Sequence, residues 1–156
     1  MRCRRRPGAD NELSASNETF LLDPRLAADA PLVGDLPLSR LLLMNDARFP
    51  WLILVPRRPN LRDLIDLARE EQHALLDEIN RCAHVLHALD KPDKLNIAAL
   101  GNVVAQLHVH VIARRTSDAA WPRPVWNTGE RDPYAPEALR RRLSELRIAL
   151  RLDASE

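Results

Sequence analysis

From Gln106 to Val111 the chain alternates strictly between polar and apolar side chains. Successive side chains of an extended strand point to opposite faces of a sheet, so this stretch predicts one polar row holding Gln106, His108 and His110. The intervening apolar residues predict an opposite face that belongs to a hydrophobic core. Imidazole and amide groups beside apolar surface cost free energy unless they have hydrogen-bond partners. The polar row is therefore either a satisfied hydrogen-bond ladder or a reactive site.

Other apolar runs of strand length indicate partners for this strand. The runs over 40–45 and 51–56 are separated by turn-forming residues, which predicts a hairpin. A further strand over 94–100 is joined to the polar row through Gly101-Asn102. A short helix over 23–30 and a short strand over 32–36 precede the hairpin.

Residues 69–89 have the period of a helix. One apolar stripe recurs at steps of three and four residues, formed by Leu75, Ile79, Cys82, Leu86 and Leu89. A last helix is predicted from Pro136, because proline suits the first helical turn. Together these elements predict an α+β fold, an antiparallel sheet with helices on one face.

Composition restricts the class of protein. A length of 156 residues suits one domain, and the net charge of +1 gives no general attraction to nucleic acid or to an anionic membrane. No apolar run approaches the ~18 residues that span a bilayer. Cys3 and Cys82 do not indicate a disulfide framework or a zinc site, so a cytoplasmic location is expected. Residues 1–17 are polar and basic, which predicts a flexible extension.

Three segments resemble one known family. The pattern Gln-x-His-x-His, followed by apolar residues, is similar to the His-x-His-x-His motif of the histidine-triad (HIT) nucleotidyl hydrolases and transferases, with Gln106 in place of the first histidine. The segments Leu41–Asn45 and Trp51–Arg57 resemble the family's hairpin. Lys94–Asn102 resembles the strand and turn that lead into the motif. The resemblance covers about residues 20–125.

This resemblance implies a fold, a domain division and partners. It implies a HIT-like antiparallel sheet of about five strands, with a long helix packed on it, within a nucleotide-binding domain over 18–126. Residues 127–156 are then a loop and a helix packed on the same domain. The family commonly dimerises through its long helix and a sheet edge, so a homodimer is expected, whereas the residues alone would also allow a monomer. No metal ion or other cofactor is expected.

The resemblance also implies roles for single residues. His108 falls at the position of the nucleophile that attacks the α-phosphorus of a nucleotide, and a backbone carbonyl is expected to fix its other ring nitrogen. His110 would orient the phosphate and donate to its growing charge, beside Gln106 in the same row. The expected nucleotide contacts are Asn45 to the ribose, with Asn102 and Arg114 to the phosphates.

Two positions depart from the family's pattern. Gln106 cannot exchange a proton near neutral pH, and Val103 stands where some members carry a hydroxyl group. Loss of a histidine acid should hurt poor leaving groups most, which predicts that dinucleoside polyphosphates are better substrates than nucleoside phosphoramidates. The alternatives to a hydrolase are a nucleotide-binding protein without turnover and a nucleotidyltransferase that uses an acceptor other than water.

The other histidines and the tryptophans are interpreted more simply. His73, His84 and His87 lie off the apolar stripe of the long helix, so a solvated helix face is expected rather than a metal site. Trp121 and Trp126 are interpreted as core packing, with a lid over a bound base as the alternative.

Overall fold

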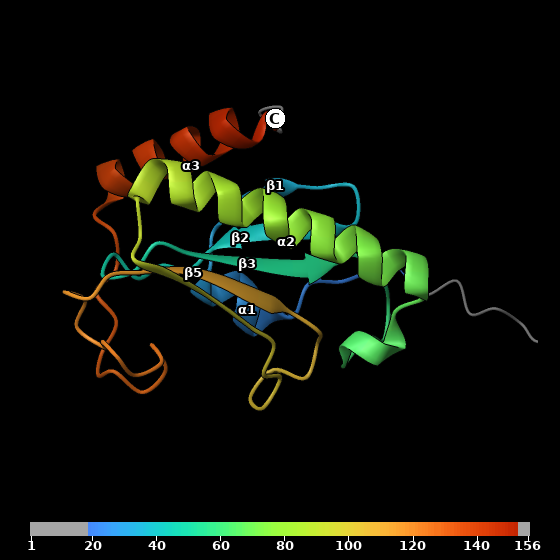
Figure 1. The fold of residues 1–156 in the computed structure, drawn as a ribbon. Helices are drawn as coiled ribbons and strands as arrows, with labels where there is room; N and C mark the ends of the chain where they lie inside the picture. The colour runs from blue at the N-terminus through green and yellow to red at the C-terminus, as the bar shows by residue number, and fades with distance from the viewer. Residues whose placement is uncertain (1–18, 153–156) are drawn as a thin grey trace, which may run out of the picture.

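A five-stranded antiparallel sheet forms the centre of the structure, a computed structural model that describes residues 19–152 (Figure 1). The order across the sheet is β1-β2-β3-β5-β4. The strands are β1 (Leu32–Asp35), β2 (Ser39–Leu43), β3 (Trp51–Pro56), β4 (Lys94–Ala98) and β5 (Val109–Arg114). The helices are α1 (Pro24–Asp29), a 3₁₀ turn η1 (Leu64–Asp66), α2 (Arg69–Asp90) and α3 (Pro136–Leu150). The predicted α+β fold, with its long helix and C-terminal helix, is confirmed.

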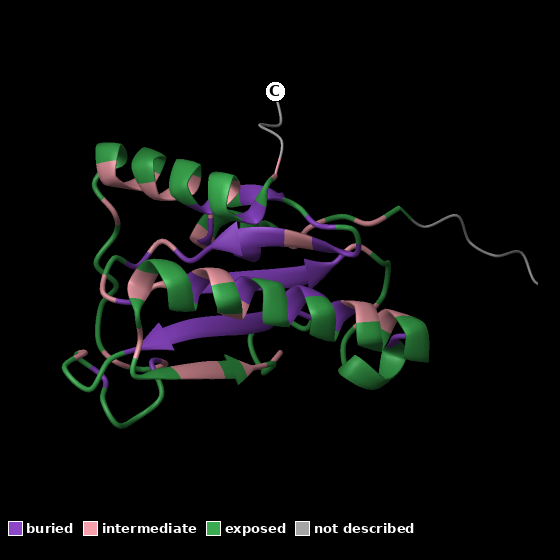
Figure 2. Ribbon diagram, turned by 45° about the horizontal axis from the view of Figure 1, so that its top comes forward, coloured by how far each residue is buried: buried purple, intermediate pink, exposed green. Residues whose placement is uncertain are grey.

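The long helix α2 and the C-terminal helix α3 cover one face of the sheet (Figure 2). Four of the five predicted stripe residues are buried there: Leu75, Ile79, Cys82 and Leu86. Leu89 is 41% exposed, because it lies in the last turn of α2 beyond the packed part of the stripe. His73, His84 and His87 are exposed, as predicted.

The opposite face of the sheet has a second core. Leu26 of α1 packs there with Ile53 of β3 and Ile112 of β5, together with Val125 from the loop after β5. The prediction that the helices lie on one face was therefore wrong for α1. Apolar side chains point to both faces of the central strands, so the second face also needs a cover.

Strands β3 and β5 are buried along their whole length, whereas β4 is an edge strand with partly exposed side chains (Figure 2). The strand that carries the polar row begins at Val109, three residues after the predicted start. The backbone before it turns away from the ladder, because the N–H of Leu107 donates to the carbonyl of Leu61 instead of to a neighbouring strand.

Two expectations concern the ends of the chain and membranes. The predicted flexible extension over residues 1–17 lies outside the described residues. Between residues 19 and 152, no helix is both long enough and apolar enough to cross a membrane.

Candidate active site

The two histidines of the polar row lie side by side at the start of β5. His110 is a strand residue that pairs with Ile53 of β3 and Ala98 of β4, and His108 directly precedes the strand. Their ring centroids are 4.9 Å apart and the rings meet edge to face. Both side chains are more than nine-tenths buried. The prediction that His108 and His110 share a face is confirmed.

The ring of His108 is held by the backbone. Its Nδ1 lies 2.6 Å from the carbonyl oxygen of Gln106. A carbonyl only accepts hydrogen bonds, so Nδ1 carries a proton, and the uncharged form of the ring then has its lone pair on Nε2. This carbonyl is the expected backbone acceptor. The lone pair on Nε2 is what allows an uncharged histidine to act as a nucleophile.

The ring of His110 is held in the opposite tautomer. The indole Nε1–H of Trp51 donates to its Nδ1 at 2.9 Å. An indole nitrogen only donates, so Nδ1 of His110 accepts and Nε2 carries the proton. Burial, and then the neighbouring charge on His108, lower the pKa of His110 to about 3. Near neutral pH this ring is therefore an uncharged hydrogen-bond donor.

Gln106 does not share the face of the two histidines, which corrects the sequence prediction. Its Nε2 donates to the carbonyl of Leu21 at 2.8 Å, and its Oε1 accepts from the N–H of Asp23 at 2.9 Å. The physical reason is that the chain bends at residue 106, before β5 begins, so the strict alternation of a strand does not reach it. Gln106 acts on His108 through its backbone carbonyl, while its side chain binds the segment before α1.

A cavity of about 410 Å³ opens beside the histidines. His108 and His110 form part of its wall, together with the loop that follows β4. Asn102 lines it, as predicted for a phosphate contact, next to Gly101. Gly101 has φ of +71°, a left-handed conformation that glycine adopts without strain. Trp51 and Trp126 line the cavity next to His110, and its other lining residues include Asp29, Asp46, Arg48, Thr128 and Arg131.

Two predicted nucleotide contacts lie away from this cavity. The side-chain oxygen of Asn45 accepts from the backbone N–H of Tyr134 at 3.0 Å, so a ribose contact would require that bond to be exchanged. Arg114 is 1% exposed, and its guanidinium pairs with Asp118 and donates to Asn96. These contacts occupy the guanidinium within the fold, and neither Asn45 nor Arg114 lines the cavity.

Residues 25–117, more than half of the chain, match the HIT domain family. The chain belongs to the HIT family.

Solved histidine triad proteins from bacteria match most of this HIT-domain protein and are themselves matched over nearly their whole length. One from Bradyrhizobium japonicum is 49% identical, with a TM-score of 0.83, over 85% of this chain and 99% of that one. One from Sinorhizobium meliloti is 44% identical, with a TM-score of 0.81, over 83% and 96%. One from Marinobacter aquaeolei is 42% identical, with a TM-score of 0.84, over 88% and 100%. No curated protein matches the chain.

Sequence reasoning missed the charged residues that line the cavity in this HIT-domain protein. The buried carboxylate of Asp46 forms an ion pair at 2.7 Å with the partly buried Arg48, which also donates to the carbonyl of Thr128. Burial raises the pKa of Asp46, but the hydrogen bonds from Arg48 outweigh it and the pKa is lowered overall. Arg131 pairs with Asp29 at 2.8 Å and thereby ties the loop after β5 to α1. The Asp-x-Arg spacing was the one local signal available.

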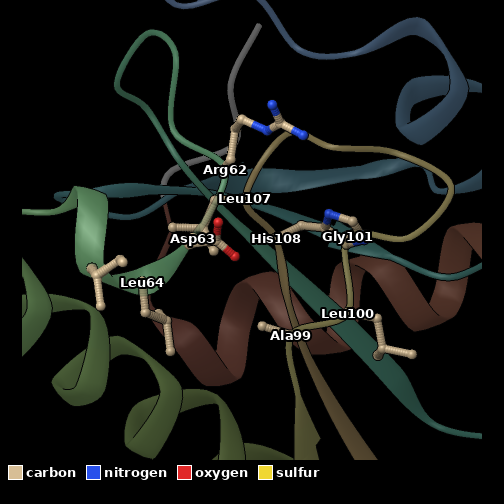
Figure 3. A pocket seen from close by; sticks show the side chains of 9 residues that line it. Arg62, Asp63, Leu64, Ala99, Leu100, Gly101, Leu107 and His108 are labelled. Atoms are coloured by element: carbon tan, nitrogen blue, oxygen red, sulfur yellow. The ribbon is translucent and has the colours of Figure 1, made fainter.

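A second, smaller hollow of about 330 Å³ also reaches His108 of this HIT-domain protein (Figure 3). Its wall is formed by Leu64 of η1 and by Ala99 to Gly101, which follow β4. The side chains of Arg62 and Asp63 stand at this hollow, and the carboxylate of Asp63 points toward His108. His108 therefore lines both hollows, together with Leu100 and Gly101.

Metal binding was not expected for this HIT-domain protein. Within residues 19–152, no three side chains of His, Cys, Asp or Glu gather where they could hold a metal ion. The residues that line the cavity supply hydrogen-bond donors and ion pairs.

Proposed function

We propose that this HIT-domain protein is a nucleotidyl hydrolase that cleaves a dinucleoside polyphosphate, or a similar nucleotide conjugate, at its α-phosphate. Membership of the family supports nucleotide binding. The observation that carries the proposal is the pair of opposite tautomers. His108 offers a lone pair on its Nε2, whereas His110 offers an N–H on its own Nε2. Both rings line one cavity.

The reaction has two steps in which bonds and protons balance. The lone pair of His108 Nε2 attacks the α-phosphorus, and the bond from phosphorus to the bridging oxygen breaks with its electron pair on the leaving phosphate. Water then attacks the same phosphorus, the P–N bond breaks, and the proton from water leaves to solvent as the nucleoside monophosphate departs. His110 donates its Nε2–H to a phosphate oxygen as charge grows there. A polyphosphate needs no proton to leave, so Gln106 is tolerated.

Release of AMP from diadenosine tetraphosphate by the purified protein and by the variant His108→Ala tests this proposal. We expect turnover by the wild type and a loss of about 10³-fold or more in the variant, because the nucleophile is removed. Binding of AMP should persist in the variant, which separates catalysis from binding. Equal rates of AMP release by both proteins would contradict a role for His108 as nucleophile.

A nucleotide-binding protein without turnover is the second candidate. The contacts of Gln106 favour it, because both polar atoms of its side chain are bound to Leu21 and Asp23 and neither supplies a proton. It predicts AMP binding by the wild type with no hydrolysis of either diadenosine tetraphosphate or adenosine phosphoramidate. Measuring both substrates also tests leaving-group preference, since a higher kcat/KM for the phosphoramidate would contradict the polyphosphate preference.

We also propose that the protein forms a homodimer through β4 and α2. The support is that β4 is an edge strand of the sheet and carries Ile97, which is 50% exposed. Leu76 of α2 is 54% exposed. An edge strand with an exposed apolar side chain is a template for pairing with a second strand.

A further inference from the structure

The geometry points to Trp51 as a positioning residue that holds His110 in the tautomer with its proton on Nε2, so that the ring can serve as a donor in the cavity. This inference rests on the proposed function for its catalytic meaning. The hydrogen bond and the tautomer themselves can be measured without any substrate. Trp51 belongs to the hairpin that resembles the family's hairpin, but no role was assigned to it from the sequence.

Three rings surround His110, and only one of them is hydrogen-bonded to it in the described residues. Trp51 approaches at 5.5 Å between centroids and donates its indole N–H at 2.9 Å. Trp126 lies at 5.2 Å and His108 at 4.9 Å, both edge to face and with no hydrogen bond to His110. Trp126 is therefore a natural control, because it touches the same ring without constraining its protons.

A buried neutral imidazole needs such a partner to choose between its two tautomers. His110 is 4% exposed, so water has little access to its nitrogens. Without a donor at Nδ1, the proton can sit on either nitrogen, and the tautomer with Nδ1–H leaves no donor on Nε2. The indole of Trp51 removes that alternative because it cannot accept a hydrogen bond.

The charged groups around the cavity do not replace the hydrogen bond from Trp51 in selecting the tautomer of His110. His108, two residues earlier in the chain, is the titratable neighbour whose ring meets that of His110. Asp46, Arg48, Asp29 and Arg131 line the same cavity, but they are paired with one another. Burial and the proximity of His108 keep the pKa of His110 at about 3. The neutral ring is thus set by burial, while the choice of nitrogen is set by Trp51.

The first test is the NMR spectrum of the imidazole nitrogens in the wild-type protein labelled with ¹⁵N-histidine. His110 is identified by the signal that the variant His110→Gln lacks. We expect one pyridine-like nitrogen at Nδ1 and one protonated nitrogen at Nε2, unchanged from about pH 5 to about pH 8. A protonated Nδ1 in the wild type would overturn the inference without any change to Trp51.

The second test compares Trp51→Phe with Trp126→Phe. Both replace a neighbouring indole by a smaller ring, but only the first removes the N–H that reaches His110. We expect a mixture of His110 tautomers in Trp51→Phe and the wild-type tautomer in Trp126→Phe. If the two variants give the same tautomer ratio, the hydrogen bond is not what positions the ring.

Kinetics connect the tautomer to turnover. If the protein hydrolyses diadenosine tetraphosphate, Trp51→Phe should lower kcat by about tenfold with a smaller change in KM, because the donor is misplaced in part of the population. The variant Trp51→His, which restores a ring N–H on a smaller side chain, should recover part of this loss. A lower kcat in Trp51→Phe with an unchanged His110 tautomer would overturn the positioning role.

Discussion

Gln106 binds two parts of the chain at once. Its side-chain amide binds the backbone of Leu21 and Asp23, while its own carbonyl accepts the proton on Nδ1 of His108. These two side-chain bonds require one donor atom and one acceptor atom on the same side chain. The amide group of glutamine has both in one plane. The position that resembles the first histidine of the motif therefore anchors the backbone from which the nucleophile is oriented.

The variant Gln106→Glu tests this anchor. It keeps the shape but replaces the donor to Leu21 by an oxygen that faces a carbonyl oxygen, so the free energy of unfolding should fall by about 1–3 kcal/mol. The activity should fall as well, because the carbonyl that holds His108 moves with the side chain. Urea unfolding and AMP release measure the two effects.

Gln72→Glu is the matched control for that variant. Gln72 also donates from Nε2 to a backbone carbonyl, that of Leu67, at 2.9 Å. It does not line the cavity, so this variant should lose stability but keep its activity. Equal losses of activity in both variants would contradict a specific link between Gln106 and His108.

His110 gives stability a pH dependence whose direction follows from its burial. Its pKa is about 3 in the folded protein and about 6.5 in the unfolded chain, so the unfolded chain binds an extra proton between these values. Stability due to this residue is therefore fully present above about pH 6.5 and is lost as the pH falls toward 3. Urea unfolding at about pH 7 and about pH 5 should show a smaller loss in His110→Gln than in the wild type.

The paired carboxylates lose their contribution to stability in a different pH range from His110. The pKa values of Asp46 and Asp118 are lowered by their arginine partners, so their contributions are lost only in more acidic solution. A wild-type protein and a His110→Gln variant that lose the same stability between about pH 7 and about pH 5 would contradict the buried neutral state of His110.

Single residues were predictable from the sequence only where the backbone geometry was regular. The alternation within a strand placed His108 and His110 together, because their side chains follow from the strand itself. It could not place Gln106, where the chain bends, or Arg114, which is paired with Asp118 after a turn. Trp51 was missed because its contact with His110 joins two strands whose register the sequence does not state.

At the scale of the elements, only one face of the long helix α2 packs against the sheet. Leu86 of α2 is fully buried, whereas Leu76 of the same helix is 54% exposed. Leu86→Ala should lower the free energy of unfolding by about 2–5 kcal/mol, because it leaves a cavity between α2 and the sheet.

Leu76→Ala is the control on the same helix, and it should change the free energy of unfolding of the monomer by no more than about 0.5 kcal/mol. Thermal unfolding monitored by circular dichroism distinguishes the two. Similar losses of unfolding free energy in both variants would contradict the prediction, because they would show that Leu76 is packed as well as Leu86.

Helix α2 and the hairpin were predictable as elements because their periods of 3.6 and 2 residues are local properties of the sequence. The start of β5 was not, since the hydrogen bond from Leu107 to Leu61 is made by a loop far along the chain. The position of α1 was also beyond local pattern. Its single buried residue, Leu26, does not indicate which face of the sheet it covers.

At the scale of the whole molecule, the edge strand β4 sets the test for assembly. Ile97→Lys places a charge on the exposed edge and should convert a dimer into a monomer, because the buried charge would have no partner. Light scattering after size-exclusion chromatography measures the mass. Ile148→Lys, on an exposed position of α3, should leave the mass unchanged.

A monomeric mass for the wild-type protein would contradict the proposed dimer directly. A dimeric mass for Ile97→Lys would instead place the interface elsewhere.

The overall fold itself was predictable because the order of elements, the hairpin and the family motif all agree with one antiparallel sheet. Assembly was not, because a strand has the same sequence pattern whether its second edge meets solvent or another chain.

The bonds from Gln106 also bear on the order in which the chain folds. They join residue 106 to residues 83 and 85 positions earlier, so they close one of the long loops of the molecule. Closing such a loop costs entropy, and contacts of this span form after local helices and hairpins. We therefore expect the backbone around His108 to become ordered late, when the segment before α1 docks. A folding intermediate that has formed the hairpin and α2 would have part of the native core, but His108 would not yet be held in its native orientation.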